Sequence, residues 1–79
     1  MRLDKFLKVS RLIKRRTVAC EACNAGRVTV NDKTAKASTA VKPGDIIKIS
    51  FGTKDVTVEV LELLDSVKKE DADRMIRYM

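Results

Sequence analysis

The apolar residues at the start of the chain recur with the period of a helix. Four of them fall within an arc of about 120° on a helical wheel: Leu3, Phe6, Leu7 and Ile13. Four basic residues lie on the other side: Lys5, Lys8, Arg11 and Arg15. Val9 and Leu12 fall outside the apolar arc, so we expect the helix to end near residue 12 or a second element to cover them. One side of this helix then packs on a core, and the other presents positive charge.

A second, shorter helix is predicted from Thr17 to about Ala25. The Thr17 hydroxyl is a suitable N-cap, because it can accept a hydrogen bond from a free N–H of the first turn. Gly26 ends the helix as a residue that easily adopts the left-handed conformation. The alternation in residues 27–30 then predicts a strand that ends at a turn over residues 31–32.

Two further strands are predicted after a less regular segment over residues 33–41. In the turn at residues 42–45, Pro43 fixes one φ and Gly44 supplies a positive φ. This turn begins a strand over 46–51, and the turn at 52–55 leads into a strand over 56–61 with alternating valines. The tail from 69 to 79 is predicted to hold at most one short helix, with Met75, Ile76 and Met79 on its apolar side.

These elements predict one small α+β domain in which two N-terminal helices pack on a small twisted, antiparallel-rich sheet. We expect residues 1–65 to form the domain and residues 66–79 a charged C-terminal tail. The chain has 79 residues, of which 44% are hydrophobic, and no run approaches the roughly 18 apolar residues of a membrane-spanning helix. The first residues lack the apolar core of a signal peptide, so a cytoplasmic location is expected. We also expect the protein to be a monomer.

Positive charge is concentrated in the first two-thirds of the chain. Residues 1–54 carry 13 Lys or Arg and 4 Asp or Glu, whereas residues 55–79 carry 4 and 7. Polyanions suit such a field, because neutralising phosphates releases condensed counterions. Nucleic acid is the favoured partner. A membrane-surface protein and an adaptor for an acidic protein are the alternatives.

Cys20 and Cys23 form a CxxC pattern, but the sequence offers little chemistry for it. Zinc needs about four ligands, and the chain has no histidine and no other cysteine. We expect packing or surface roles; a half-site completed by another chain and a redox pair are the alternatives. The lack of histidine, of a glycine-rich phosphate loop and of an acidic cluster argues against an enzyme, and neither a metal nor a cofactor is expected.

The candidate nucleic-acid-binding site lies at the start of the second helix. Arg15, Arg16 and Thr17 stand where free N–H groups and the helix dipole attract phosphate. Asp4 is the one acid in this region, and it could pair with Lys8 or accept hydrogen bonds from RNA. Tyr78 is the only plausible stacking platform, which favours folded RNA recognised by shape and backbone. The full set of expected RNA contacts is Arg2, Asp4, Lys5, Lys8, Arg11, Lys14, Arg15, Arg16, Thr17, Arg27, Asn31, Lys33 and Lys36.

The order of motifs resembles a known family. RLDKFL at 2–7, RT at 16–17, GRVTVND at 26–32 and KPGDIIKI at 42–49 resemble the alpha-L RNA-binding module, named for ribosomal protein S4. Asp32 departs from the glycine that the family usually has there, which makes the tightness of that turn a question for the structure.

This resemblance implies a specific function. Short stand-alone copies of the module that begin like this chain are similar to ribosome-associated quality-control factors related to heat-shock protein 15. The resemblance implies binding to rRNA of the large ribosomal subunit and to tRNA on a stalled particle. It also implies support for alanine tailing of the nascent chain by a partner protein, RqcH. A recycling factor like heat-shock protein 15, or a general structured-RNA-binding protein in ribosome assembly, is the alternative.

Overall fold

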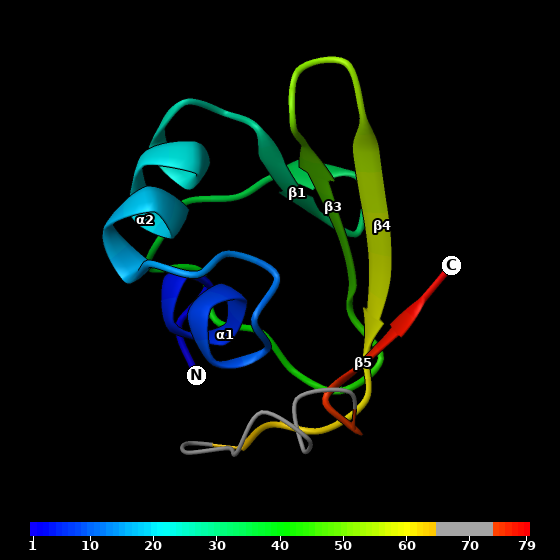
Figure 1. Ribbon diagram of the computed structural model, residues 1–79. Coiled ribbons are helices and arrows are strands. Elements are labelled where there is room, and N and C mark those ends of the chain that lie inside the picture. Colours follow the sequence, from blue (N-terminus) through cyan, green and yellow to red (C-terminus); the bar gives the residue numbers. More distant parts are fainter. Residues whose placement is uncertain (65–73) are drawn as a thin grey trace.

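A computed structural model describes residues 1–64 and 74–79 of the chain. Two helices precede five strands: α1 (Leu3–Val9), α2 (Arg16–Asn24), β1 (Val28–Val30), β2 (Lys33–Thr34), β3 (Ile46–Ser50), β4 (Asp55–Val60) and β5 (Ile76–Tyr78). The strands form one sheet in the order β2-β1-β3-β4-β5, and all neighbours are antiparallel. Both helices lie on the same side of this sheet (Figure 1). The expected arrangement of two helices on an antiparallel sheet is therefore present.

Helix α1 is shorter than its hydrophobic pattern predicts. It ends at Val9 because Arg11 adopts a positive φ of 63°, and the Arg11 N–H bonds to the Lys8 carbonyl at 3.1 Å. This left-handed residue redirects the chain. Ile13 is buried as expected, but it reaches the core from the connection to α2, where its N–H bonds to the Leu7 carbonyl at 3.1 Å.

Helix α2 begins and ends on different kinds of cap. The predicted Thr17 N-cap is wrong: the N-cap is Arg15, and no side chain caps the helix. The predicted end at Gly26 is confirmed, with a φ of 76° and its N–H bonded to the Cys23 carbonyl at 3.0 Å. The Arg27 N–H bonds to the Ala22 carbonyl at 3.0 Å, which completes a Schellman motif.

The turn between β1 and β2 is tight although Asp32 replaces glycine. Asn31 and Asp32 have φ values of 54° and 67°, the positive pair that a type I′ hairpin turn requires. The Asn31 amide donates to the Asp45 carboxylate at 3.1 Å and accepts from the Ile46 N–H at 3.0 Å. The turn is thus tied to the start of β3.

The central strands follow the predicted alternation. Ile47 pairs with Val58 and Ile49 with Val56 in the β3–β4 register. The turn before β3 is held by Asp45, whose side chain accepts from the Lys42 N–H at 3.0 Å while Gly44 adopts a φ of 95°. The inward side chains of β3 and β4 therefore face the helices.

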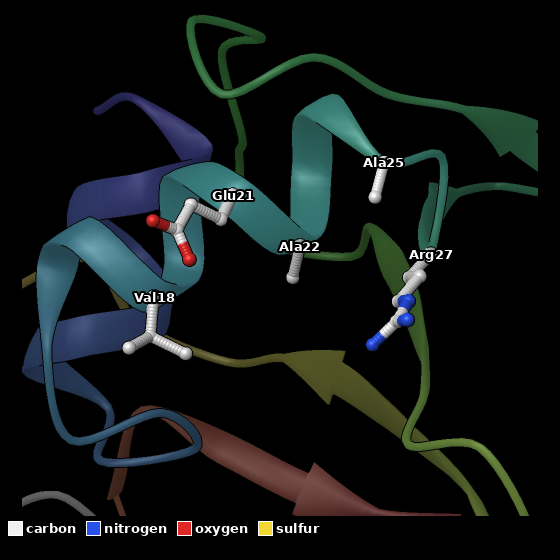
Figure 2. A pocket seen from close by; sticks show the side chains of 5 residues that line it. All are labelled: Val18, Glu21, Ala22, Ala25 and Arg27. Atoms are coloured by element: carbon white, nitrogen blue, oxygen red, sulfur yellow. The ribbon is translucent and has the colours of Figure 1, made fainter.

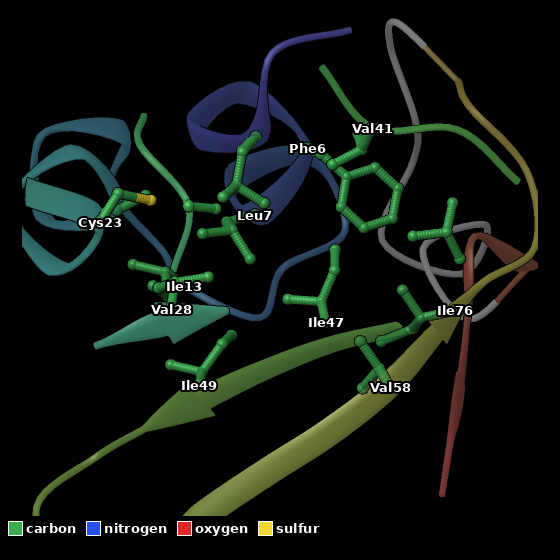
Figure 3. Packing of buried hydrophobic residues seen from close by; sticks show 14 of the residues in the cluster. Phe6, Leu7, Ile13, Cys23, Val28, Val41, Ile47, Ile49, Val58 and Ile76 are labelled. Carbon is green, nitrogen blue, oxygen red and sulfur yellow. The ribbon is translucent and has the colours of Figure 1, made fainter. Parts of the chain in front are cut away.

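The core lies between the helices and the sheet. Phe6 and Leu7 point from α1 towards Ile47 and Val58 on the sheet, and all four are fully buried (Figure 3). Burying a side chain of this size stabilises the fold by roughly 1.5–3 kcal/mol. Within the described residues, no helix has the length and apolar character needed to cross a membrane.

The end of the chain differs from the expected appendage. Ile76–Tyr78 forms strand β5, with Arg77 opposite Glu59 and Ile76 opposite Val60. Met75 and Ile76 are buried, whereas Met79, expected on the same helical side, is 70% exposed. A helix over 74–79 is therefore wrong, because pairing with the open edge of β4 imposes an extended backbone. The earlier part of that expected helix lies outside the described residues.

Burial of Met75 predicts that the C-terminal strand contributes to stability. Met75→Ala should lower the free energy of unfolding by about 2–4 kcal/mol, because it removes a fully buried side chain. Met79→Ala is the matched control and should change it by less than about 0.5 kcal/mol. Urea unfolding followed by circular dichroism measures both. Equal, small effects would show that Met75 adds nothing to the core.

Candidate nucleic-acid interface

The start of α1 is fixed by the segment that follows β2. The Leu3 N–H bonds to the Thr39 carbonyl at 2.7 Å, and the Asp4 N–H bonds to the Ala37 carbonyl at 3.1 Å. Arg2 forms an antiparallel bridge with Ala40. The first N–H groups of α1 are therefore used within the protein, and the backbone around Lys36 lies against the start of the helix.

Asp4 is buried between two arginines. Asp4 is only 4% exposed, and its Oδ1 accepts a hydrogen bond from the Lys5 N–H at 2.8 Å. Arg2 approaches with its Nε 3.3 Å from Oδ1 and its Nη2 3.4 Å from Oδ2. The Nε of Arg16 lies 3.4 Å from Oδ2. One carboxylate thus joins α1 to the first residue of α2. We call Arg2, Asp4 and Arg16 the Asp4 cluster.

This arrangement changes the expected role of Asp4. The predicted ion pair with Lys8 is absent from the described structure, and the partners are Arg2 and Arg16 instead. Both arginine side chains remain about half exposed, at 54% and 49%, although the carboxylate between them is buried. Their remaining N–H donors are therefore accessible to a ligand.

The N-terminus of α2 lies directly beside this cluster, because Arg16 is its first residue. The N–H groups of Arg16, Thr17 and Val18 have no hydrogen-bond partner within residues 1–64 and 74–79. Arg15, Arg16 and Thr17 are exposed. Free N–H groups and the partial positive charge of the helix end favour an anion at this place. The start of α2 therefore has the exposed residues and free N–H groups that the sequence predicts there, and phosphate binding by them stays a prediction.

Apart from Lys36, which is exposed in the segment after β2, the other predicted residues fall into two groups. Lys8, Arg11 and Lys14 are exposed along α1 and its connection to α2, and Lys5 is partly buried on α1. Arg27, Asn31 and Lys33 belong to the β1–β2 hairpin region, and in the described chain none of these three contacts the Asp4 cluster through a hydrogen bond or ion pair. The Asn31 side chain is used in the turn. The first group extends the basic surface, whereas the second stands apart from it.

A hollow of about 250 Å³ lies beside the exposed side of α2 (Figure 2). Val18, Glu21, Ala22, Ala25 and Arg27 line it. It is shallow, and its floor is made of small apolar side chains with one charge of each sign at the border. Sequence reasoning missed this hollow, because its lining combines one side of α2 with a residue beyond the helix.

The two cysteines differ in their surroundings. Cys23 is buried in the core with Ala19, whereas Cys20 is partly buried and accepts a weak hydrogen bond from the Asn24 amide at 3.6 Å. Val18, which precedes them on the same helix, is 46% exposed. Burial raises the pKa of the Cys23 thiol to about 11, with the Asp4 carboxylate and Cys20 adding to the shift. A raised pKa and low access are the opposite of what a redox-active thiol needs.

The raised pKa predicts a slow reaction at Cys23. At pH 8 the folded protein should be alkylated by iodoacetamide at Cys20 first, because Cys23 stays protonated and covered. Mass spectrometry of the peptides measures the order of modification, and protein unfolded in urea serves as the control in which both react. Faster modification of Cys23 in the folded protein would contradict the packing role.

Comparison with known proteins identifies relatives over nearly the whole chain. The sequence profile of the S4 domain family matches residues 1–47. The chain is 61% identical over 75 residues to an RQC P-site tRNA stabilizing factor of Bacillus subtilis, covering 95% of this chain and 87% of the relative. It is 41% identical over 73 residues to a factor of the same name from Helicobacter pylori, covering 90% and 87%.

Two solved structures share the fold. The trimeric structure of Vibrio cholerae heat shock protein 15 matches with a TM-score of 0.92 and 29% identity, covering 100% of this chain and 81% of the other. The solution structure of a hypothetical protein, HP1423, matches with a TM-score of 0.85 and 37% identity, covering 100% and 96%. These likenesses confirm the expected fold class over all the elements described above.

Proposed function

This chain belongs to the S4 domain family, and we propose that it is a non-catalytic RNA-binding factor of the large ribosomal subunit. The particle that it binds carries a stalled peptidyl-tRNA, and its role is in ribosome-associated quality control. The observation that carries the proposal is the Asp4 cluster beside the open N-terminus of α2, which lies within the matched residues. The name of the Bacillus subtilis relative supports tRNA in the P site as the ligand.

The chemistry of this surface suits folded RNA. Two half-exposed guanidinium groups and free helix N–H groups can donate several hydrogen bonds to neighbouring phosphates. Lys8, Arg11 and Lys14 add positive charge beside them. A factor that binds the particle only when tRNA is present stabilises that tRNA by mass action, because dissociation of the tRNA then also requires loss of the factor.

The protein's location, oligomeric state and partner protein extend this proposal. We propose that the protein acts in the cytoplasm as a monomer and supports the addition of C-terminal alanines by RqcH. Vibrio cholerae heat shock protein 15, one of the structural neighbours, has a trimeric structure. Light scattering on the purified protein tests the monomer directly, since one chain has a mass of 8.9 kDa.

A recycling role, which the sequence resemblance to heat-shock protein 15 also implies, is the second candidate. The two candidate functions predict different effects on the alanine tail that grows on the nascent chain. In a reconstituted reaction with stalled large subunits and RqcH, the proposed factor should increase the number of alanines added per nascent chain. An unchanged tail with faster release of tRNA would favour recycling instead.

The surface predicts which variants lose binding. Arg16→Ala and Arg2→Ala should each reduce co-sedimentation with tRNA-carrying large subunits by roughly tenfold, since hydrogen bonds between charged groups contribute about 1.5–3 kcal/mol each. Lys33→Ala is a matched control on the β1–β2 hairpin and should bind nearly as well as the unmodified protein. Leu7→Ala reports a folding defect, because it removes a buried side chain.

The same assay tests whether phosphates carry the affinity. With about five phosphates contacted, binding should weaken by a factor on the order of several hundred between 50 and 200 mM salt. A nearly flat response would contradict the electrostatic part of the proposal. If Lys33→Ala and Lys36→Ala lost binding while the two arginine variants kept it, the RNA surface would belong to the segment after β1.

A further inference from the structure

We propose that Asp4 is a positioning residue, whose buried carboxylate orients the guanidinium groups of Arg2 and Arg16 towards phosphate of the bound RNA. This inference rests on the proposed function and deepens it. Asp4 does not itself contact RNA in this arrangement, since its carboxylate is covered and both of its oxygens face cations or a backbone N–H.

The carboxylate is held in place from the backbone side. Its Oδ1 accepts from the Lys5 N–H at 2.8 Å, and the Asp4 N–H is anchored on the Ala37 carbonyl at 3.1 Å. The peptide groups before and after Asp4 are therefore both held by hydrogen bonds. Asp4 also lies close enough to α2 to raise the pKa of the buried Cys23 thiol. The acid is thus a rigid point between the two helices.

Each arginine uses only some of its N–H donors to contact the Asp4 carboxylate. Arg2 donates one Nη2 N–H to Oδ2 and has its Nε turned towards Oδ1 at 3.3 Å, and Arg16 donates its Nε–H to Oδ2. A guanidinium group has five N–H donors, so three on Arg2 and four on Arg16 remain for a ligand. Because the group is planar, fixing one edge fixes the direction of the others. Each arginine can therefore hold the carboxylate and present its free donors to phosphate at the same time.

Without the acid, two long side chains near each other would repel and sample many rotamers. A ligand would then have to order both side chains on binding, which lowers the affinity. The acid reduces the net positive charge of the surface, which by itself weakens attraction to RNA. Positioning and charge thus predict effects of opposite sign when the acid is neutralised.

This opposition gives a direct test with Asp4→Asn. The amide keeps the shape of the side chain and an acceptor for the Lys5 N–H, but it lacks the charge that holds the arginines. If positioning dominates, Asp4→Asn should weaken binding to tRNA-carrying large subunits by about tenfold, although the protein gains one positive charge. Unchanged or tighter binding would overturn the inference.

Asp55→Asn is the matched control. Asp55 pairs with Lys48 at 3.6 Å, and both side chains are 52% exposed, so this variant removes the same charge from an exposed ion pair of the sheet. Binding by Asp55→Asn should be unchanged or slightly tighter. An equal loss in both variants would show that the effect of Asp4→Asn has nothing to do with the arginines, and the inference would fail.

A mutant cycle separates this inference from the proposed function. In a protein that already carries Arg2→Ala and Arg16→Ala, adding Asp4→Asn should cause no further loss of affinity. A further loss would overturn positioning. If the double arginine variant itself bound normally, the proposed RNA surface would be wrong. If it stayed folded by circular dichroism and lost binding while Asp4→Asn kept it, the proposed function would stand and the positioning role would not.

A measurement on the unmodified protein covers the case in which Asp4→Asn does not fold. In the free protein, the Nε–H groups of Arg2 and Arg16 should show ¹⁵N heteronuclear NOE values close to those of the backbone. The exposed Arg11, which makes no ion pair within the described residues, is the internal control and should show a low value. Equal mobility of all three arginines would overturn the inference.

Discussion

The ion pairs of the buried Asp4 carboxylate hold together the surface that we propose to bind RNA. A charge in this position is strongly unfavourable unless it is paired and hydrogen-bonded. Arg2, Arg16 and the Lys5 N–H meet that requirement, and they come from the chain end, from α2 and from α1. The need to compensate one buried charge therefore brings together the cations that the proposed function uses, so the residues that stabilise the carboxylate are also those proposed to bind RNA.

The rest of the molecule keeps this cluster rigid. Helix α1 has only seven residues, and an isolated helix of that length is not stable in water. It persists because Phe6 and Leu7 pack on the sheet and because carbonyls of the segment after β2 accept its first N–H groups. The sheet therefore holds α1 and the Asp4 cluster in place, although few of the proposed RNA contacts belong to the sheet.

The C-terminal part of the chain enlarges that support. The S4 profile match ends at residue 47, within β3, whereas β4 and β5 continue the sheet beyond it. Met75 and Ile76 add two buried apolar side chains to a core that serves only 79 residues. A small domain buries a low fraction of its surface, so each added apolar contact is a large part of its stability.

The sequence by itself determined the features that depend on neighbouring residues. The cap at Gly26, the turns at residues 31–32 and 42–45, the alternation in β3 and β4 and the amphipathic start of α1 are all local patterns, and the structure contains them. The basic character of the first 54 residues also follows from composition. The family motifs placed the candidate site at the two helices, although RNA contact by those residues remains a prediction.

Only the tertiary structure decided the features that join distant residues. Asp4 pairs with Arg16, twelve positions away, rather than with Lys8 one helical turn away, because packing of α1 against α2 brings Arg16 to the carboxylate. Ile13 enters the core only because Arg11 turns the chain back. Residues 76–78 become a strand because β4 offers an open edge, which outweighs any local helical preference. Spacing along a sequence encodes the period of an element, but partners across the fold depend on where the elements meet.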